Sequence, residues 1–223
     1  MAKERMKSPR VRLFVALNLP DQFLDGFVSW QEGAFEDRRD LRLLSRYSLH
    51  ITLVFLGYQA EKDVEKIAEL SFAEPSSPFG LRAEDIVEVP PRRPRLYAVG
   101  MEDNDGALGK FQAGIAERLA KAGLYEPEKR PFWPHLTVAR FKQTEKHRTA
   151  GGPRGRPGRQ SGGSSEPAGP LPEFPDELRE PFQANRLTLY KSTLKPQGAE
   201  YEPLAKMDLD AAGKGDSLGA GSE

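Results

Sequence analysis

The segments SLHITLVFLG (residues 48–57) and PHLTVARF (residues 134–141) decide the fold. Both are short, apolar and rich in branched or aromatic residues, which is typical of a buried β-strand. Both also carry the pattern His-x-Thr, which begins at His50 in the first segment and at His135 in the second. The chain has only three histidines, so a chance repeat of this pattern is rare. We interpret the two segments as equivalent strands of two related halves.

The same order of elements surrounds both motif strands. Each half reads as a strand, a helix and the motif strand: residues 11–19, 20–32 and 49–57 in the first, and residues 95–101, 105–123 and 135–141 in the second. The helices are predicted from apolar side chains that recur every three or four residues. A further helix is predicted at residues 61–72, and further strands at residues 79–89, 185–192 and 199–206. This order predicts an internal duplication in a fold of the α+β class.

Alternation along a strand places residues i and i+2 on one face, about 6.6 Å apart. His50 and Thr52 therefore share one face, and His135 and Thr137 share the equivalent face of the second strand. The apolar residues of the first segment are expected on the opposite face: Ile51, Leu53 and Phe55. Two such strands would present two imidazoles and two hydroxyls to one small group at the floor of a cleft.

This set of groups suits phosphoryl chemistry. A neutral imidazole can take a proton from water, a protonated one can give a proton to a leaving oxygen, and the usual histidine pKa of about 6.5 allows both forms near neutral pH. Threonine hydroxyls can donate hydrogen bonds to phosphate oxygens, and an arginine would stabilise the negative charge.

A single histidine on a strand is more often structural, but the repeated pair favours a functional interpretation. Two histidines without a carboxylate or cysteine at ligand spacing make a poor zinc site, and His147, in a polar run, is interpreted as a surface residue.

The composition excludes several classes of protein. The 223 residues include 33 basic and 33 acidic side chains, which excludes a strongly basic coat for nucleic acid but leaves room for a local basic cleft. There is no cysteine, which excludes disulfide scaffolds and thiolate metal sites and fits a reducing cytoplasm. No apolar run approaches the roughly 20 residues of a membrane helix. We expect a cytoplasmic protein, and the absence of heptads favours a monomer.

Three segments are expected to be disordered. Residues 149–170 (TAGGPRGRPGRQSGGSSEPAGP) contain no large apolar side chain and read as a mobile insertion between strands. Residues 1–10 read as a flexible N-terminus, and residues 207–223 as a disordered tail. The folded domain of two lobes is therefore predicted to span residues 11–206.

At these motifs the sequence resembles the 2H phosphoesterase superfamily, which is named for its paired His-x-Thr/Ser-x motifs, and within it the RNA 2′,3′-cyclic phosphodiesterase family, long called 2′-5′ RNA ligase. The supporting segments are RLFVALNLP (12–20), HITLVFLG (50–57), RPRLYAVG (93–100), PHLTVAR (134–140) and LYKSTLKPQGAEYEPL (189–204). The resemblance implies a bilobal, duplicated fold in which two antiparallel sheets form a V-shaped cleft with helices outside.

The resemblance also implies hydrolysis of a terminal 2′,3′-cyclic phosphate of RNA to a 2′-phosphate, without a metal or another cofactor. It suggests reversible 2′-5′ RNA ligation as a further reaction, and tRNA fragments as RNA partners. His50 would be the proton donor and His135 the proton acceptor. Thr52 and Thr137 would hold phosphate oxygens, and Arg140 would contact the phosphate. Simple alternation places Arg140 on the face opposite His135, so it needs a bulge, strand twist or a strand end to reach the site.

Other interpretations stay open at this point. The enzyme could act instead on 2′-5′ oligoadenylate or a small cyclic nucleotide, or the chain could be a non-catalytic module that binds RNA ends. Retention of both His-x-Thr motifs argues against the binding module, because binding alone needs no matched acid and base. Four aromatic residues near the motifs are candidates for stacking on a base: Tyr47, Tyr58, Phe132 and Trp133. Core packing is an equal alternative for the last two.

Overall fold

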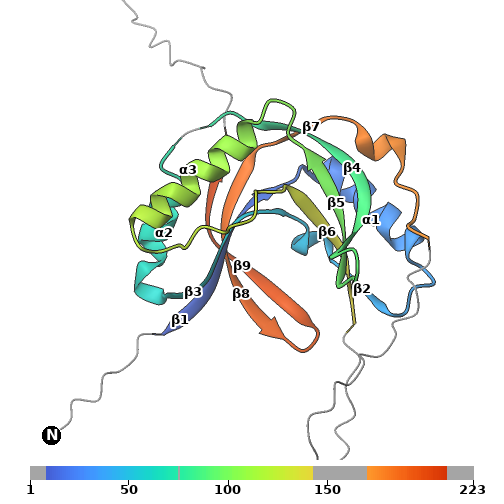
Figure 1. The fold of residues 1–223 in the computed structure, drawn as a ribbon, viewed down its shortest axis with the longest axis horizontal. Coiled ribbons are helices and arrows are strands. Elements are labelled where there is room, and N and C mark those ends of the chain that lie inside the picture. Colours follow the sequence, from blue (N-terminus) through green and yellow to red (C-terminus); the bar gives the residue numbers. More distant parts are fainter. Residues whose placement is uncertain (1–8, 75, 143–169, 210–223) are drawn as a thin grey trace, which may run out of the picture.

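We analysed a computed structural model, which describes residues 9–74, 76–142 and 170–209 of the chain (Figure 1). The predicted flexible residues 1–8, all but the last residue of the predicted insertion at 149–170, and the predicted tail from residue 210 onward lie outside the described residues.

Nine strands and three α-helices make up the described fold. The strands are β1 (Arg10–Asn18), β2 (Leu41–Leu43), β3 (Ile51–Ala60), β4 (Phe79–Val89), β5 (Leu96–Glu102), β6 (His135–Phe141), β7 (Phe182–Ala184), β8 (Arg186–Lys195) and β9 (Gly198–Asp208). The helices are α1 (Asp21–Ala34), α2 (Val64–Ser71) and α3 (Ala107–Lys121), with short 3-10 turns at Arg46–Ser48, Glu61–Asp63 and Asp176–Arg179. The predicted helix at 61–72 is thus a 3-10 turn that continues into a shorter α-helix.

The strands form one curled antiparallel sheet in the order β7-β4-β5-β6-β3-β1-β8-β9. The short strand β2 pairs with the last three residues of β6. The sheet arches, with α2 and α3 covering one half of its outer side and α1 the other (Figure 1). The order strand, helix, strand occurs as β1-α1-β3 and again as β5-α3-β6. The α+β class and the internal duplication in the order of elements are therefore confirmed.

The two halves meet along β3 and β6, where the two expected antiparallel sheets are joined into one. These strands pair through one residue pair, Ile51 with Leu136, which makes the sheet continuous. Both side chains are fully buried in the core. His50 and His135 directly precede this pair in the sequence, so the alternation of the strands turns both histidines to the concave side of the sheet.

The fold also extends past the predicted boundaries. Arg10 already belongs to β1, and β9 continues to Asp208. Arg186 Nε lies 2.6 Å from the Asp208 carboxylate, and the Leu209 backbone N–H donates to the Asn185 carbonyl, with Leu209 buried. The long β8–β9 ladder continues into these residues, and apolar Met207 and Leu209 pack with the core, so they belong to the fold and not to the predicted tail.

In the described parts of the chain, no helix is both long and apolar enough to cross a membrane.

We predict that truncation at the junction of the two halves is costly. Ile51→Ala or Leu136→Ala should each lower the free energy of unfolding by about 2–5 kcal/mol, because each removes a fully buried side chain and leaves a cavity. Chemical denaturation followed by circular dichroism measures the change. The control is Leu194→Ala on the exposed β8–β9 hairpin, where 62% of the side chain is exposed and a change within about 0.5 kcal/mol is expected. Equal effects at all three positions would contradict the junction as a core element.

Candidate active site

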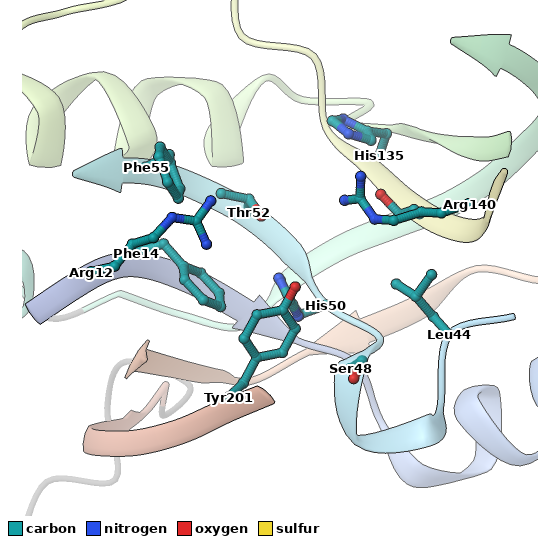
Figure 2. A pocket seen from close by; sticks show the side chains of 11 residues that line it. Arg12, Phe14, Leu44, Ser48, His50, Thr52, Phe55, His135, Arg140 and Tyr201 are labelled. Carbon is teal, nitrogen blue, oxygen red and sulfur yellow. The ribbon is translucent and has the colours of Figure 1, made fainter. Parts of the chain in front are cut away.

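A cavity of about 130 Å³ opens on the concave side of the sheet where β3 and β6 meet (Figure 2). It is lined by Arg12, Phe14, Leu44, Ser48, His50, Thr52, Phe55, His135, Thr137, Arg140 and Tyr201. All five residues singled out from the sequence are in this set: His50, Thr52, His135, Thr137 and Arg140. Sites for drug-sized ligands are typically about 300–1,000 Å³, so this cavity fits a phosphate group better than a whole nucleotide.

The two histidine rings are anchored in the same way. The His135 Nδ1 lies 2.9 Å from the Trp133 backbone carbonyl. The ring of His50 hydrogen-bonds the Ser48 backbone carbonyl, which also lies two residues before the histidine. A carbonyl oxygen can only accept, so Nδ1 of His135 carries a proton and Nε2 is left for the cavity. The duplication therefore extends to the hydrogen bonds that orient the rings.

Aromatic side chains hold the two rings differently. His50 stacks on Phe14 with ring centroids 4.8 Å apart, and Tyr201 meets it edge-on at 5.3 Å. His135 stacks on Trp133, with centroids 4.4 Å apart and an angle of 13° between the planes. Trp133 itself is 40% exposed. His50 is thus enclosed on two sides, whereas His135 sits against a partly solvated ring.

A β-bulge follows the first motif and corrects the expectation for Phe55. Thr52 pairs with Ala16, but Val15 pairs with Val54, so Leu53 is an extra residue in β3. The extra residue reverses the alternation. Phe55 therefore lies on the same face as Thr52 and lines the cavity, not the opposite face as simple alternation predicts.

The same bulge follows the second motif and brings Arg140 into the site. Thr137 pairs with Ala98 and Ala139 with Tyr97, so Val138 is the extra residue in β6. Arg140 therefore faces the cavity (Figure 2). Thr137 lines the same cavity. Phe55 and Arg140 occupy equivalent positions of the duplicated motif, three residues after each threonine.

The backbone carbonyls of both bulge residues accept hydrogen bonds from other elements of the fold. The Leu53 carbonyl accepts a hydrogen bond from Nε2 of Gln112 on α3 at 3.2 Å. The Val138 carbonyl accepts one from the Leu44 backbone N–H at 3.0 Å. These bonds from outside the two strands stabilise the irregularity, because a buried carbonyl without a donor is costly.

Arg12 is a site residue that the sequence did not single out. It precedes Phe14 by two positions on β1, so the two share a face, and its Cζ lies 4.5 Å from the centroid of the Phe55 ring. Its Nη1 donates to Ser192 Oγ on β8 at 2.7 Å. An arginine at the start of an apolar strand reads as a surface charge, and only the bulge that redirects Phe55 places an aromatic face beneath it. Phe14 and Tyr201 were missed for a similar reason, because aromatic residues in strands usually indicate core.

The cavity is electropositive. No acidic side chain lines it, and among the described residues neither Arg12 nor Arg140 makes an ion pair. Burial, with the nearby charges of Arg140 and His135, lowers the pKa of His50 to about 4, although its bond to the Ser48 carbonyl opposes the shift. Burial and Arg140 also lower the pKa of His135. Both rings are therefore neutral at pH 7 in the free protein.

The four aromatic candidates for base stacking lie in different surroundings. Tyr47 and Tyr58 are 87% and 55% exposed. Phe132 packs against the core, while Trp133 supports His135. None of the four lines the cavity itself, so base stacking stays a prediction.

Among the described residues, no group of three or more His, Asp or Glu side chains lies close enough together to hold a metal ion.

Comparison with known proteins gives a consistent result. Residues 20–150 match the family model of the 2′-5′ RNA ligase superfamily. The chain is 27% identical over 194 residues to an RNA 2′,3′-cyclic phosphodiesterase of Methanocaldococcus jannaschii, covering 86% of this chain and 97% of that protein. It is also 27% identical over 206 residues to an RNA 2′,3′-cyclic phosphodiesterase of Thermus thermophilus, covering 89% and 90%.

Solved structures share the fold. A crystal structure of a Thermus thermophilus protein superposes with a TM-score of 0.69 and 24% identity, over 91% of this chain and all of that chain. Escherichia coli LigT in the apo form gives 0.67 with 22% identity, over 92% of this chain and all of LigT. These likenesses support the curled antiparallel sheet described above.

We predict a pH dependence of stability that depends on His50. Its pKa is near 6.5 in the unfolded chain and about 4 in the folded one, so the unfolded state binds more protons between these values and stability falls as the pH drops from about 6.5 to 4. His50→Gln should lose less stability than the wild type over this range, by roughly 1–2 kcal/mol at pH 5. Urea denaturation at pH 7 and pH 5 tests this, and parallel losses in both proteins would contradict the buried, neutral ring.

Proposed function

Because this chain belongs to the 2′-5′ RNA ligase superfamily, we propose that it is a hydrolase that opens the 2′,3′-cyclic phosphate at the end of RNA and leaves a 2′-phosphate. The observation that carries the proposal is the convergence of both His-x-Thr motifs and of Arg12 and Arg140 on one small cavity. Among the described residues, no acidic side chain lines this cavity and neither arginine makes an ion pair. The similarity to enzymes named RNA 2′,3′-cyclic phosphodiesterase supports the choice of substrate.

The proposed reaction needs one base and one acid on opposite sides of the phosphorus atom. Neutral His135 takes a proton from water through Nε2, and the resulting hydroxide forms a bond to phosphorus. The bond between phosphorus and O3′ breaks, and O3′ leaves with a proton from His50. The products are a 2′-phosphate and a free 3′-hydroxyl. Proton transfers of this kind typically contribute about 10²–10⁴ each to the rate.

The acid role of His50 requires that substrate charge changes its protonation. Its pKa of about 4 leaves the ring neutral in the free protein at pH 7. A phosphodiester anion in the cavity favours the charged imidazolium and raises the pKa of both rings. Because desolvation disfavours the charged form of this ring, its proton is readily given up when the negative charge moves to the leaving oxygen. His50 therefore acts as an acid only once the substrate has been bound.

The remaining residues bind the phosphate. Thr52 and Thr137 donate hydroxyl hydrogen bonds to its non-bridging oxygens. Arg140 faces the cavity beside Thr137 and stabilises the charge that builds up on those oxygens in the transition state.

The same site would also support 2′-5′ ligation. If the 5′-hydroxyl of a second RNA end takes the place of water, the same two rings catalyse formation of a 2′-5′ bond and its reversal.

The proposal includes the setting of the reaction. The substrates are RNA ends with cyclic phosphates, tRNA fragments among them, and the protein acts as a monomer in the cytoplasm without a metal. The absence of cysteine and the balance of 33 basic with 33 acidic residues support this setting.

Activity is tested with an oligoribonucleotide that ends in a 2′,3′-cyclic phosphate, in the presence of EDTA. We expect a 2′-phosphate product and a bell-shaped dependence of kcat on pH. His50→Ala and His135→Ala should each reduce kcat at least about 100-fold, because each removes one proton transfer. The matched control is His147→Ala, which removes the histidine outside both motifs and should retain activity. Loss of activity in EDTA would contradict the metal-free mechanism, and activity on 2′-5′ oligoadenylate alone would contradict the choice of substrate.

Removal of Arg140 should change both the rate and its pH dependence. Its charge lowers the pKa of both histidines, so Arg140→Ala should raise these pKa values and move the acidic limb of the kcat/KM profile to higher pH, together with a loss of about 100-fold or more in kcat. Arg140→Lys should leave the limb near its wild-type position because the charge is kept. A purely structural role would lower the rate of both variants without moving the limb.

A further inference from the structure

The concave face of the first half continues outward from the cavity along β1 and β3. Arg12 pairs with Tyr58, and Arg10 pairs with Ala60 at the outer end of the two strands. Directly opposed residues of an antiparallel pair share a face, so Tyr58 lies on the same face as Arg12. We call Arg10, Arg12, Phe55 and Tyr58 the outer strip.

The outer strip alternates cations with exposed aromatic rings. Phe55 and Tyr58 are 38% and 55% exposed, which is unusual for large aromatic side chains in a sheet. Arg12 lies over the Phe55 ring, and Arg10 donates to the Tyr58 backbone carbonyl. Arg10 and Arg12 are two residues apart on one strand, about 6.6 Å, and among the described residues neither has an acidic partner. Both therefore offer an uncompensated positive charge.

The fold does not require this strip, because the described residues of the second half show no counterpart of it. Thr52 pairs with Ala16 and Thr137 with Ala98, so the position equivalent to Arg12 is Pro94. β3 has ten residues and β6 has seven, and β6 ends soon after Arg140. The extra length of β3 is what carries Tyr58. In one half only, an extension of the sheet carries exposed aromatic rings beside arginines that have no acidic partner among the described residues. This combination points to a ligand.

Resting on the proposed function, we propose that the outer strip binds the single-stranded RNA directly upstream of the cyclic phosphate, so that the enzyme selects an RNA strand end over a 2′,3′-cyclic mononucleotide. The cavity accepts the phosphate alone, and the attached strand has to leave it across a neighbouring surface. Bases stack on aromatic rings whatever their sequence, and arginines follow the phosphate backbone. The strip offers both groups in alternation and begins at the cavity with Arg12 and Phe55.

The test compares two substrates with the same terminal nucleoside: a 2′,3′-cyclic mononucleotide and a hexaribonucleotide ending in the same cyclic phosphate. The wild type should have the higher kcat/KM on the hexamer. Tyr58→Ala and Arg10→Ala should each lower the ratio of the two kcat/KM values at least about tenfold, mainly through KM on the hexamer. Arg10→Ala should also weaken the salt dependence of the hexamer KM, since one phosphate contact is lost.

The control is Arg92→Ala, an exposed cation on the turn between β4 and β5 in the other half, which should leave the ratio and the salt dependence unchanged. Binding of a labelled hexamer with a 3′-phosphate, followed by fluorescence anisotropy, tests the strip without any hydrolysis. Weaker binding by both strip variants supports it even if the proposed reaction fails. A wild type without preference for the hexamer, or variants that keep both the ratio and the affinity, would overturn the inference.

Discussion

The site depends on one contact, the buried pair Ile51 and Leu136 that joins the two halves of the sheet. Each of these residues directly follows a motif histidine. Packing the two apolar side chains into the core therefore turns His50 and His135 to the opposite, concave side at the same level. The free energy of core burial in this way places both imidazoles at one cavity, and neither histidine needs a direct contact with the other. A shift of one residue in this pairing would turn the histidine of the shifted strand to the core side and take it out of the cavity.

The two halves share their irregularities as well as their order. Each motif strand has a bulge directly after its threonine, and each bulge carbonyl has a donor from another element. What differs is the residue that the bulge turns inward, Phe55 in one half and Arg140 in the other. Arg140 brings its charge to the cavity, whereas Phe55 lies under Arg12. The rings differ too, because His50 is enclosed by Phe14 and Tyr201 while His135 rests on exposed Trp133. The two histidines of a repeated framework therefore have unlike surroundings, which is what the proposed pairing of one acid with one base requires.

The sequence predicted the elements that have strong periodicity, with β4 and β6 at their observed bounds. It missed β2 and β7, which have three residues each and depend on partners far along the chain. Both His-x-Thr pairs were found because the signal lies within three residues. Phe55 and Arg12 were not, because their roles depend on a bulge, and one extra residue in a strand has no signature in a single sequence. The pairing of β3 with β6 was also not predicted, because Ile51 and Leu136 are 85 positions apart and look like ordinary core residues.

The central claim is that His50 and His135 act on one phosphate, and imidazole NMR with a bound nucleoside 2′-phosphate tests it most directly. If the claim is right, saturation with this product raises the pKa of both rings together, because one dianion lies between them, while His147 keeps its value. A rise at only one of the two rings, or at neither while the nucleotide is bound, would contradict the account.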